Sequence, residues 1–298
     1  MQNIYWAIYK NLEKELISLT NVIHFDDEQL PCYSSKFIDL LIRICIEIES
    51  ISKQLYLSNQ GTTYSNENEM YFDTVCLNYL ENIFHLSSKT IFICNSNVYF
   101  QKTENIELQP LHKANKRGTS GADWKKAYQS VKHNRSENYK KGNMKNTIRA
   151  LGALYILNLY NNNQDFKMES LYELNHFDES IGSEFFSVKI NKEPTRIGKM
   201  SYVPEAIYNI TLSKELLERG QKELDKVNAK VNELVFREPA FIQAIANGIN
   251  PNQFDDWSTA MCFMIGKERY HQITEKVVRE SDVVRITQNQ QYVACLNK

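Results

Sequence analysis

Glycine and proline are scarce in this sequence, whose 298 residues include ten glycines and six prolines. All-β sandwiches connect many short strands through tight turns, and those turns depend on these two residue types. Their scarcity argues against such a sandwich and favours a mainly α-helical fold. The chain is longer than a typical single domain, so we expect two units, or one domain with a large extension.

Long hydrophobic runs are missing as well. No segment approaches the ~20 consecutive apolar residues of a membrane-spanning helix. In the N-terminal segment MQNIYWAIYKNLEKELISL, lysine and glutamate interrupt each apolar run before it reaches the length of a signal-peptide core. We therefore expect a cytoplasmic protein that does not associate with membranes.

Motifs for metals and cofactors are also absent from the sequence. The six cysteines are scattered, no pair has CxxC spacing, and neither HExxH nor a glycine-rich phosphate-binding motif occurs. These absences predict free cysteines in a reducing compartment, no bound metal and no cofactor.

The formal net charge of -1 hides a strong asymmetry along the chain. The segment 113–149 contains eleven lysines and arginines but only two acidic residues, a balance of +9, whereas the remainder has 24 basic and 34 acidic residues. A basic block in an otherwise acidic chain is typical of a site for a polyanion. The alternative is a solvated basic face, and charge alone does not separate the two.

Helical periodicity dominates the first half of the chain. Apolar residues recur at helical spacing in five segments, which are residues 2–21, 36–57, 70–84, 122–133 and 143–160. The second segment is apolar nearly all round, as expected for a central bundle helix, and its polar exceptions Asp39, Arg43 and Glu47 share one face.

Two further features predict how the chain is divided. Residues 89–108 are rich in β-branched and aromatic residues, which predicts a small β insertion among the helices. The polar run NNNQD marks a candidate boundary, so we expect a helical bundle over 1–165 and a C-terminal, mostly helical (α+β) region over 166–298. The predicted fold class is therefore mainly α, and the sequence assigns no role to the second region.

The stretch WKKAYQSVKHNR, residues 124–135, combines aromatic and basic side chains within the basic block. In a helix, Trp124, Tyr128 and Val131 lie on one stripe, and core packing explains that stripe best. We expect Lys125 and Lys126 to face outward.

His133 and Arg135 follow at the end of this predicted helix. Histidine can donate or accept a proton near neutral pH, and arginine offers a rigid fork of donors for phosphate oxygens. This pair within a basic block favours a phosphodiester site over a histidine that is merely exposed.

The order of segments resembles the HEPN domains (higher eukaryotes and prokaryotes nucleotide-binding), especially a bacterial variety with a W…Y…KHxR pattern. An apolar helix with an embedded acid and arginine is followed by the β-like insertion, the helix ending in YQSVKHNR, and MKNTIRALGALYILNLY. The resemblance covers roughly residues 35–160. The residues that fall on the pattern are Trp124, Tyr128, Lys132, His133, Arg135, Asn146 and Ala150.

The resemblance implies a HEPN-like helical bundle that often forms homodimers. Active members cleave RNA without a metal and are common in toxin–antitoxin and phage-defence systems, so RNA and an antitoxin or defence-system partner protein are expected partners. Active members usually carry an arginine followed, after four to six residues, by a histidine, and this sequence has no such spacing. A metal-independent endoribonuclease and a non-catalytic nucleotide- or protein-binding module therefore both stay open, as does a scaffold with incidental basic charge.

In an endoribonuclease of this kind, the chemistry assigns roles to the basic residues. His133 would act as general base or acid, and Arg135 with Lys132 would stabilise charge on the phosphate. Arg43 and Glu47 would orient His133, or would form a buried ion pair that holds the bundle together. The residues expected to contact the nucleic acid are Lys113, Lys116, Arg117, Lys125, Lys126, Tyr139, Lys140, Lys141 and Lys145.

Overall fold

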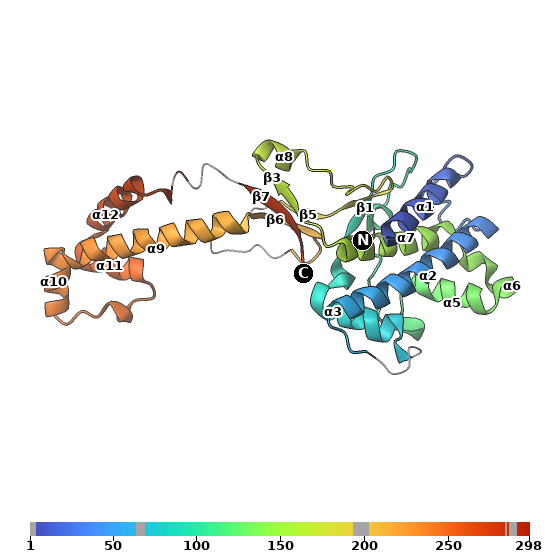
Figure 1. Cartoon of the computed structure of the whole chain (residues 1–298), viewed down its shortest axis with the longest axis horizontal. Coiled ribbons are helices and arrows are strands. Elements are labelled where there is room, and N and C mark those ends of the chain that lie inside the picture. Colours follow the sequence, from blue (N-terminus) through green and yellow to red (C-terminus); the bar gives the residue numbers. More distant parts are fainter. Residues whose placement is uncertain (1–3, 64–68, 193–202, 284, 286–290) are drawn as a thin grey trace.

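The computed structural model describes residues 4–63, 69–192, 203–283, 285 and 291–298. The molecule is elongated, with a helical bundle at one end, a small β-sheet in the middle and an arm of helices at the other end (Figure 1). Helices account for most of the described residues and the strands are short, which confirms the predicted mainly helical fold class.

The bundle is built from four long helices around one core. Its helices are α1 (Ile4–Leu19), α2 (Ser35–Ser58), α5 (Asp123–His133) and α7 (Met144–Asn162). Asn143 caps the start of α7, where its side chain accepts a hydrogen bond from the backbone N–H of Asn146 at 3.0 Å. From Ala150 to Tyr160 every residue of α7 is buried, so α7, rather than α2, is the central helix of the bundle.

The shorter helical elements connect and flank the bundle. Their bounds are η2, a π-helix (Phe72–Leu77), α3 (Asn78–Phe84), η3 (Leu86–Ser88), α4 (Thr103–Ile106), η4 (Gly118–Ser120), α6 (Arg135–Asn138), η5 (Tyr139–Lys141) and α8 (Leu171–Asn175).

The apolar stripes predicted from helical periodicity form the core of the bundle. Nine residues at helical spacing in the predicted segments are buried and belong to one cluster: Phe37, Leu41, Ile44, Ile48, Trp124, Val131, Ile148, Leu151 and Tyr155. The indole N–H of Trp124 donates to the backbone carbonyl of Pro110 at 2.8 Å, so the polar atom of this side chain is satisfied.

Trp124→Ala should lower the free energy of unfolding by about 3–5 kcal/mol, because it removes a large buried side chain and leaves a cavity. Urea unfolding followed by far-UV circular dichroism measures this loss. Trp257, whose side chain is 39% exposed on the arm, is the matched control, and Trp257→Ala should cost clearly less. Equal losses in the two variants would contradict a core role for Trp124.

The predicted β insertion is present in the first sheet. Within residues 89–108, β1 (Ile91–Ile93) pairs antiparallel with β2 (Glu107–Leu108), and α4 lies between them in the sequence. The other edge of β1 pairs antiparallel with β4 (Phe186–Val188). This sheet therefore contains strands from both sides of the predicted boundary at residue 165.

The second sheet has the strand order β3-β7-β6-β5. Its strands are β3 (Phe166–Met168), β5 (Ile190–Asn191), β6 (Tyr208–Leu212) and β7 (Tyr292–Leu296). β6 and β7 are antiparallel, with Leu212 opposite Tyr292, whereas β5 and β6 are parallel. The larger hydrophobic core includes residues of this sheet and therefore continues past residue 165.

A second, smaller hydrophobic core lies in the arm and includes Val227, Val235, Met261 and Val277. None of the described helices is long and apolar enough to cross a lipid bilayer. The arm helices are α9 (Lys214–Phe236), α10 (Pro239–Ala246), α11 (Trp257–Ile265) and α12 (Lys267–Glu280), with the 3-10 turn η6 (Pro251–Gln253) between α10 and α11.

Candidate nucleic-acid interface

Two of the predicted RNA-binding cations belong to an internal ion-pair network around Asp73. Lys125 is 4% exposed, and its ammonium group donates to Asp73 Oδ2 at 3.1 Å and to the carbonyl of Ala114 at 2.9 Å. Arg117 Nε donates to both carboxylate oxygens of Asp73, at 3.0 and 2.9 Å, and its guanidinium group lies 4.2 Å from the centre of the Tyr71 ring.

This network corrects the prediction that Lys125 faces outward. Lys125 is buried because Asp73 on η2 and the carbonyls of the preceding loop replace its water ligands, so it is not available to RNA. Burial alone would raise the pKa of Asp73, but the bonds from Arg117, Thr74 and Lys125 outweigh it and lower that pKa. Arg117 remains half-exposed but is paired with the same carboxylate.

The remaining cations of the block include a row along α5 and α7. Lys141 donates to the hydroxyl of Ser130 at 3.0 Å, and Lys145 and Arg149 follow at four-residue spacing on α7. Asp123, at the start of α5, marks the other end of the row. The bond from Lys126 lowers the pKa of Asp123, and the charges of Lys145 and Arg149 lower it further.

A cavity of ≈ 320 Å³ lies at the start of α5. It is lined by three cations, Lys113, Lys126 and Arg149, and by three carboxylates, Glu104, Glu107 and Asp123. We define the α5–α7 face as Lys113, Lys126, Lys141, Lys145 and Arg149. Arg149 was not among the predicted contacts, although its spacing from the two lysines before it on the same helical face identifies it.

Most cations of the block have no acidic partner. Lys126 pairs with Asp123 at 2.8 Å, but within the described ranges no carboxylate lies within ion-pair distance of the exposed or half-buried lysines. These lysines are Lys113, Lys116, Lys132, Lys140, Lys141 and Lys145. Tyr139, another predicted contact, is 37% exposed and packs edge-on against Tyr33.

His133 is the last residue of α5, and its side chain is exposed. Lys126, Ser130 and His133 lie three or four residues apart, so His133 is on the same helix face as the cation row. Among the described residues, no hydrogen bond or ion pair engages the imidazole. The chain then turns at Asn134, whose side chain caps α6.

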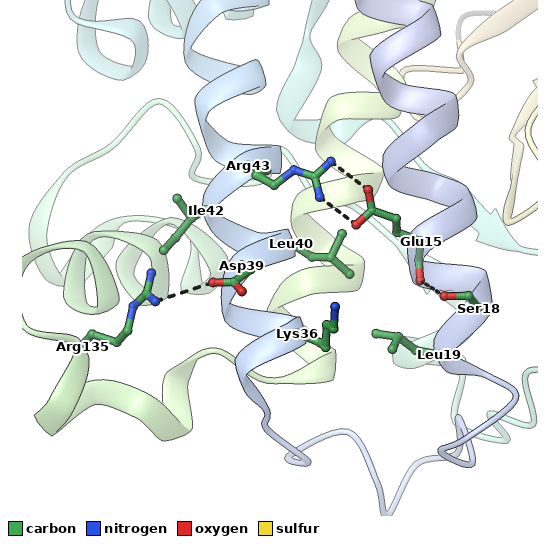
Figure 2. Close-up of a pocket in the computed structure, with 9 residues that line it drawn as sticks. All are labelled: Glu15, Ser18, Leu19, Lys36, Asp39, Leu40, Ile42, Arg43 and Arg135. Atoms are coloured by element: carbon green, nitrogen blue, oxygen red, sulfur yellow. Dashed lines mark hydrogen bonds and ion pairs between the residues drawn. The ribbon is translucent and has the colours of Figure 1, made fainter.

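Arg135, the first residue of α6, reaches toward α2. Arg135 Nη1 is 3.6 Å from Asp39 Oδ1, and both residues line a cavity of ≈ 450 Å³ (Figure 2). Lys132 donates to the hydroxyl of Tyr128 at 3.2 Å. The cavity includes Arg135 and Arg43 but not His133, so the described structure does not bring His133 and Arg135 together at one cavity.

Arg43 is engaged by α1 rather than by Glu47. Its guanidinium group makes two hydrogen bonds to the carboxylate of Glu15, at 2.7 and 2.8 Å (Figure 2). Both side chains are about half-exposed, so the predicted buried Arg43–Glu47 pair is wrong, because Glu15 accepts both arms of the fork. Burial raises the pKa of Glu47, and the nearby charge of Arg43 opposes that rise.

Metal ligands are not grouped near this interface. In the part of the chain that the structure describes, no three His, Cys, Asp or Glu side chains are close enough together to hold a metal ion.

Comparisons with family models, with curated proteins and with solved structures each gave no match to this chain. The resemblance to HEPN domains therefore rests on the sequence pattern between residues 35 and 160.

Proposed function

We propose that this chain is an RNA-binding protein of the HEPN-like kind and that it cleaves bound RNA without a metal. The observation that carries the proposal is the row of cations on the α5–α7 face, most of them without acidic partners, which ends beside the exposed His133. Unpaired lysines and arginines replace the counterions condensed on a nucleic-acid backbone. RNA bound along this row would extend toward the imidazole.

The cleavage step needs only groups that RNA and this chain supply. A base removes the proton of the 2′-OH, the 2′-oxygen attacks the phosphorus, and the bond to the 5′-oxygen breaks as that oxygen accepts a proton. The products are a 2′,3′-cyclic phosphate and a 5′-OH. His133 is the histidine of the block, and its imidazole would accept or donate the proton in this step, while the neighbouring cations stabilise charge on the phosphate.

A second copy of the chain would supply a second imidazole, so that one His133 acts as base and the other as acid. We therefore propose a homodimer as the cleaving species. On the sequence resemblance alone, we also propose a toxin–antitoxin or phage-defence role, with an antitoxin or defence-system protein as partner.

A non-catalytic binding module is the second candidate, and the position of Arg135 favours it. Arg135 lies within 4 Å of Asp39, and the cavity that both residues line does not include His133, so part of the charge of Arg135 is engaged by a carboxylate. In this case RNA would bind the α5–α7 face and remain intact.

Neutralising three lysines of the interface should weaken RNA binding and its salt dependence. The variant Lys113→Gln, Lys141→Gln, Lys145→Gln should reduce the slope of the logarithm of the association constant against the logarithm of the salt concentration by about 2. Each lost contact with single-stranded RNA lowers the magnitude of that slope by roughly 0.7. Fluorescence anisotropy with a labelled RNA at several salt concentrations measures this slope.

The matched control changes the net charge equally but at the arm, through Lys222→Gln, Lys267→Gln and Lys276→Gln. All three of these lysines are exposed. The control should bind RNA as the unaltered chain does. Equal effects of the two triple variants would mean that RNA affinity depends on the net charge of the chain and not on the α5–α7 face. That result would contradict the proposed RNA-binding site.

A further inference from the structure

A third cavity, of ≈ 830 Å³, lies away from the basic block, and its walls combine aromatic and acidic side chains. It is formed by α1, the end of α7, β3 and the segment from α8 to Gly182. β3 and α8 lie between the bundle and the arm (Figure 1). Its size is within the range of small-molecule sites, about 300–1,000 Å³. The lining includes Trp6, Phe166, Phe177, Glu173 and Asp178.

The aromatic rings of this cavity are backed by other aromatic rings. The ring of Trp6 lies 5.1 Å from that of Tyr9, which stacks on Tyr155 at 5.5 Å. The rings of Phe166 and Phe177 are 5.4 Å apart in an edge-to-face arrangement. Such packing fixes the positions of the cavity-facing rings before any ligand arrives.

One wall of the cavity is held in an unfavourable backbone conformation. Ile181 has φ +48°, in the left-handed region, where a β-branched residue costs on the order of 1–2 kcal/mol. Bonds on both sides hold it there: Tyr155 donates to the carbonyl of Ser180 at 2.7 Å, and Lys10 donates to that of Gly182 at 3.0 Å. Strain that is firmly held at a cavity wall is typical of functional sites.

The electrostatic environment of the cavity is opposite in sign to that of the α5–α7 face. The lining of the cavity contains two carboxylates, Glu173 and Asp178, and one lysine, Lys167, a formal balance of -1. One carboxylate oxygen of Asp178 accepts the N–H of Ser180 at 2.9 Å, and one of Glu173 accepts that of Glu169 at 2.7 Å. Within the part of the chain that the structure describes, the second oxygen of each carboxylate accepts no hydrogen bond.

His176 adds a further acceptor to the lining. Its Nδ1 lies 2.8 Å from the carbonyl of Tyr172, so Nδ1 carries the hydrogen and Nε2 keeps its lone pair in the neutral ring. The cavity thus offers aromatic faces, carboxylate oxygens and an imidazole nitrogen. All three attract a cation or a strong N–H donor.

We propose that this cavity binds a small organic cation, with an ammonium or guanidinium group carried on an apolar body. The aromatic rings would cover the apolar body and attract the charge, and Asp178 and Glu173 would bind the charged group. This proposal does not depend on the proposed RNA chemistry, because it uses a different surface of opposite charge.

The test measures binding of two probe cations, choline and agmatine, to the full chain by isothermal titration calorimetry. A neutral molecule of the same shape as choline, 3,3-dimethyl-1-butanol, is the matched ligand control. We expect at least one of the two cations to bind. If choline binds, its affinity should be at least tenfold higher than that of the neutral alcohol. No binding of either cation up to ~10 mM, or equal binding of choline and the alcohol, would overturn the proposal.

Variants at the cavity give effects of opposite sign. Asp178→Asn keeps the acceptor for the N–H of Ser180 but removes the charge, and it should weaken binding about fivefold. Lys167→Gln removes the lysine from the lining and should strengthen binding, whereas Phe177→Leu should weaken it. Asp225→Asn, on the exposed face of α9, is the control and should have no effect. Changes of the same sign in Asp178→Asn and Lys167→Gln would also overturn the proposal.

Discussion

His133→Ala should slow RNA cleavage by at least ~100-fold and leave RNA affinity nearly unchanged, because the imidazole exchanges the proton while the lysines bind the phosphates. Single-turnover cleavage of an end-labelled RNA measures the first quantity, and anisotropy with a non-cleavable RNA measures the second. The products should carry a 2′,3′-cyclic phosphate. An RNA with deoxyribose at the scissile position should resist cleavage, since it lacks the nucleophile.

His271→Ala is the matched control for this experiment. His271 is an exposed histidine on α12, outside the basic block, so its replacement should leave both cleavage and binding unchanged. Undiminished cleavage by His133→Ala, or cleavage of the deoxyribose-containing RNA, would rule out the mechanism. Binding without cleavage by the unaltered chain would favour the non-catalytic module.

Asp73→Asn should lower the free energy of unfolding by about 3–5 kcal/mol, the usual effect of removing one partner of a buried ion pair. The reason is that the ammonium group of Lys125 would stay buried without its anion, next to the positive charge of Arg117. Urea unfolding at neutral pH measures the loss. Asp123→Asn is the control. Asp123 forms an exposed ion pair with Lys126 on α5, the helix that carries Lys125, and this pair should contribute under about 1 kcal/mol to the free energy of unfolding.

A double variant separates the charge effect from a general loss of packing. Asp73→Leu combined with Lys125→Met removes both charges and should be more stable than Asp73→Asn alone. A double variant less stable than the single one would show that the carboxylate acts mainly through its other bonds, to Arg117 and to the backbone of Thr74.

The helices and the bundle core could be predicted from the sequence because both depend on local patterns. Trp124, Tyr128 and Val131 recur at helical spacing among polar residues of α5, and that spacing places them on the buried side. Helix α12 was not predicted, because its segment KERYHQITEKVVRE is largely polar and only Ile273 and Val277 are buried.

The features that the sequence did not predict depend on contacts between distant residues. Lys125 has the same local pattern as an exposed lysine, and its burial depends on Asp73, 52 residues earlier, and on the carbonyls of the preceding loop. Arg43 had a plausible partner four residues away, yet Glu15 on another helix gives a better bidentate geometry. The cation row likewise depends on how α7 lies against α5, which helical periodicity does not specify.

The arm is also, in topological terms, one very long hairpin loop. β6 ends at Leu212 directly opposite Tyr292, where β7 begins, so residues 213–291 leave and rejoin the sheet at one point. Excising this segment and closing the gap with a short turn would leave the ladder between these two strands intact. Natural chains tolerate insertion at such positions, and the arm can therefore be gained, lost or exchanged as a cassette without altering the order of the strands that anchor it.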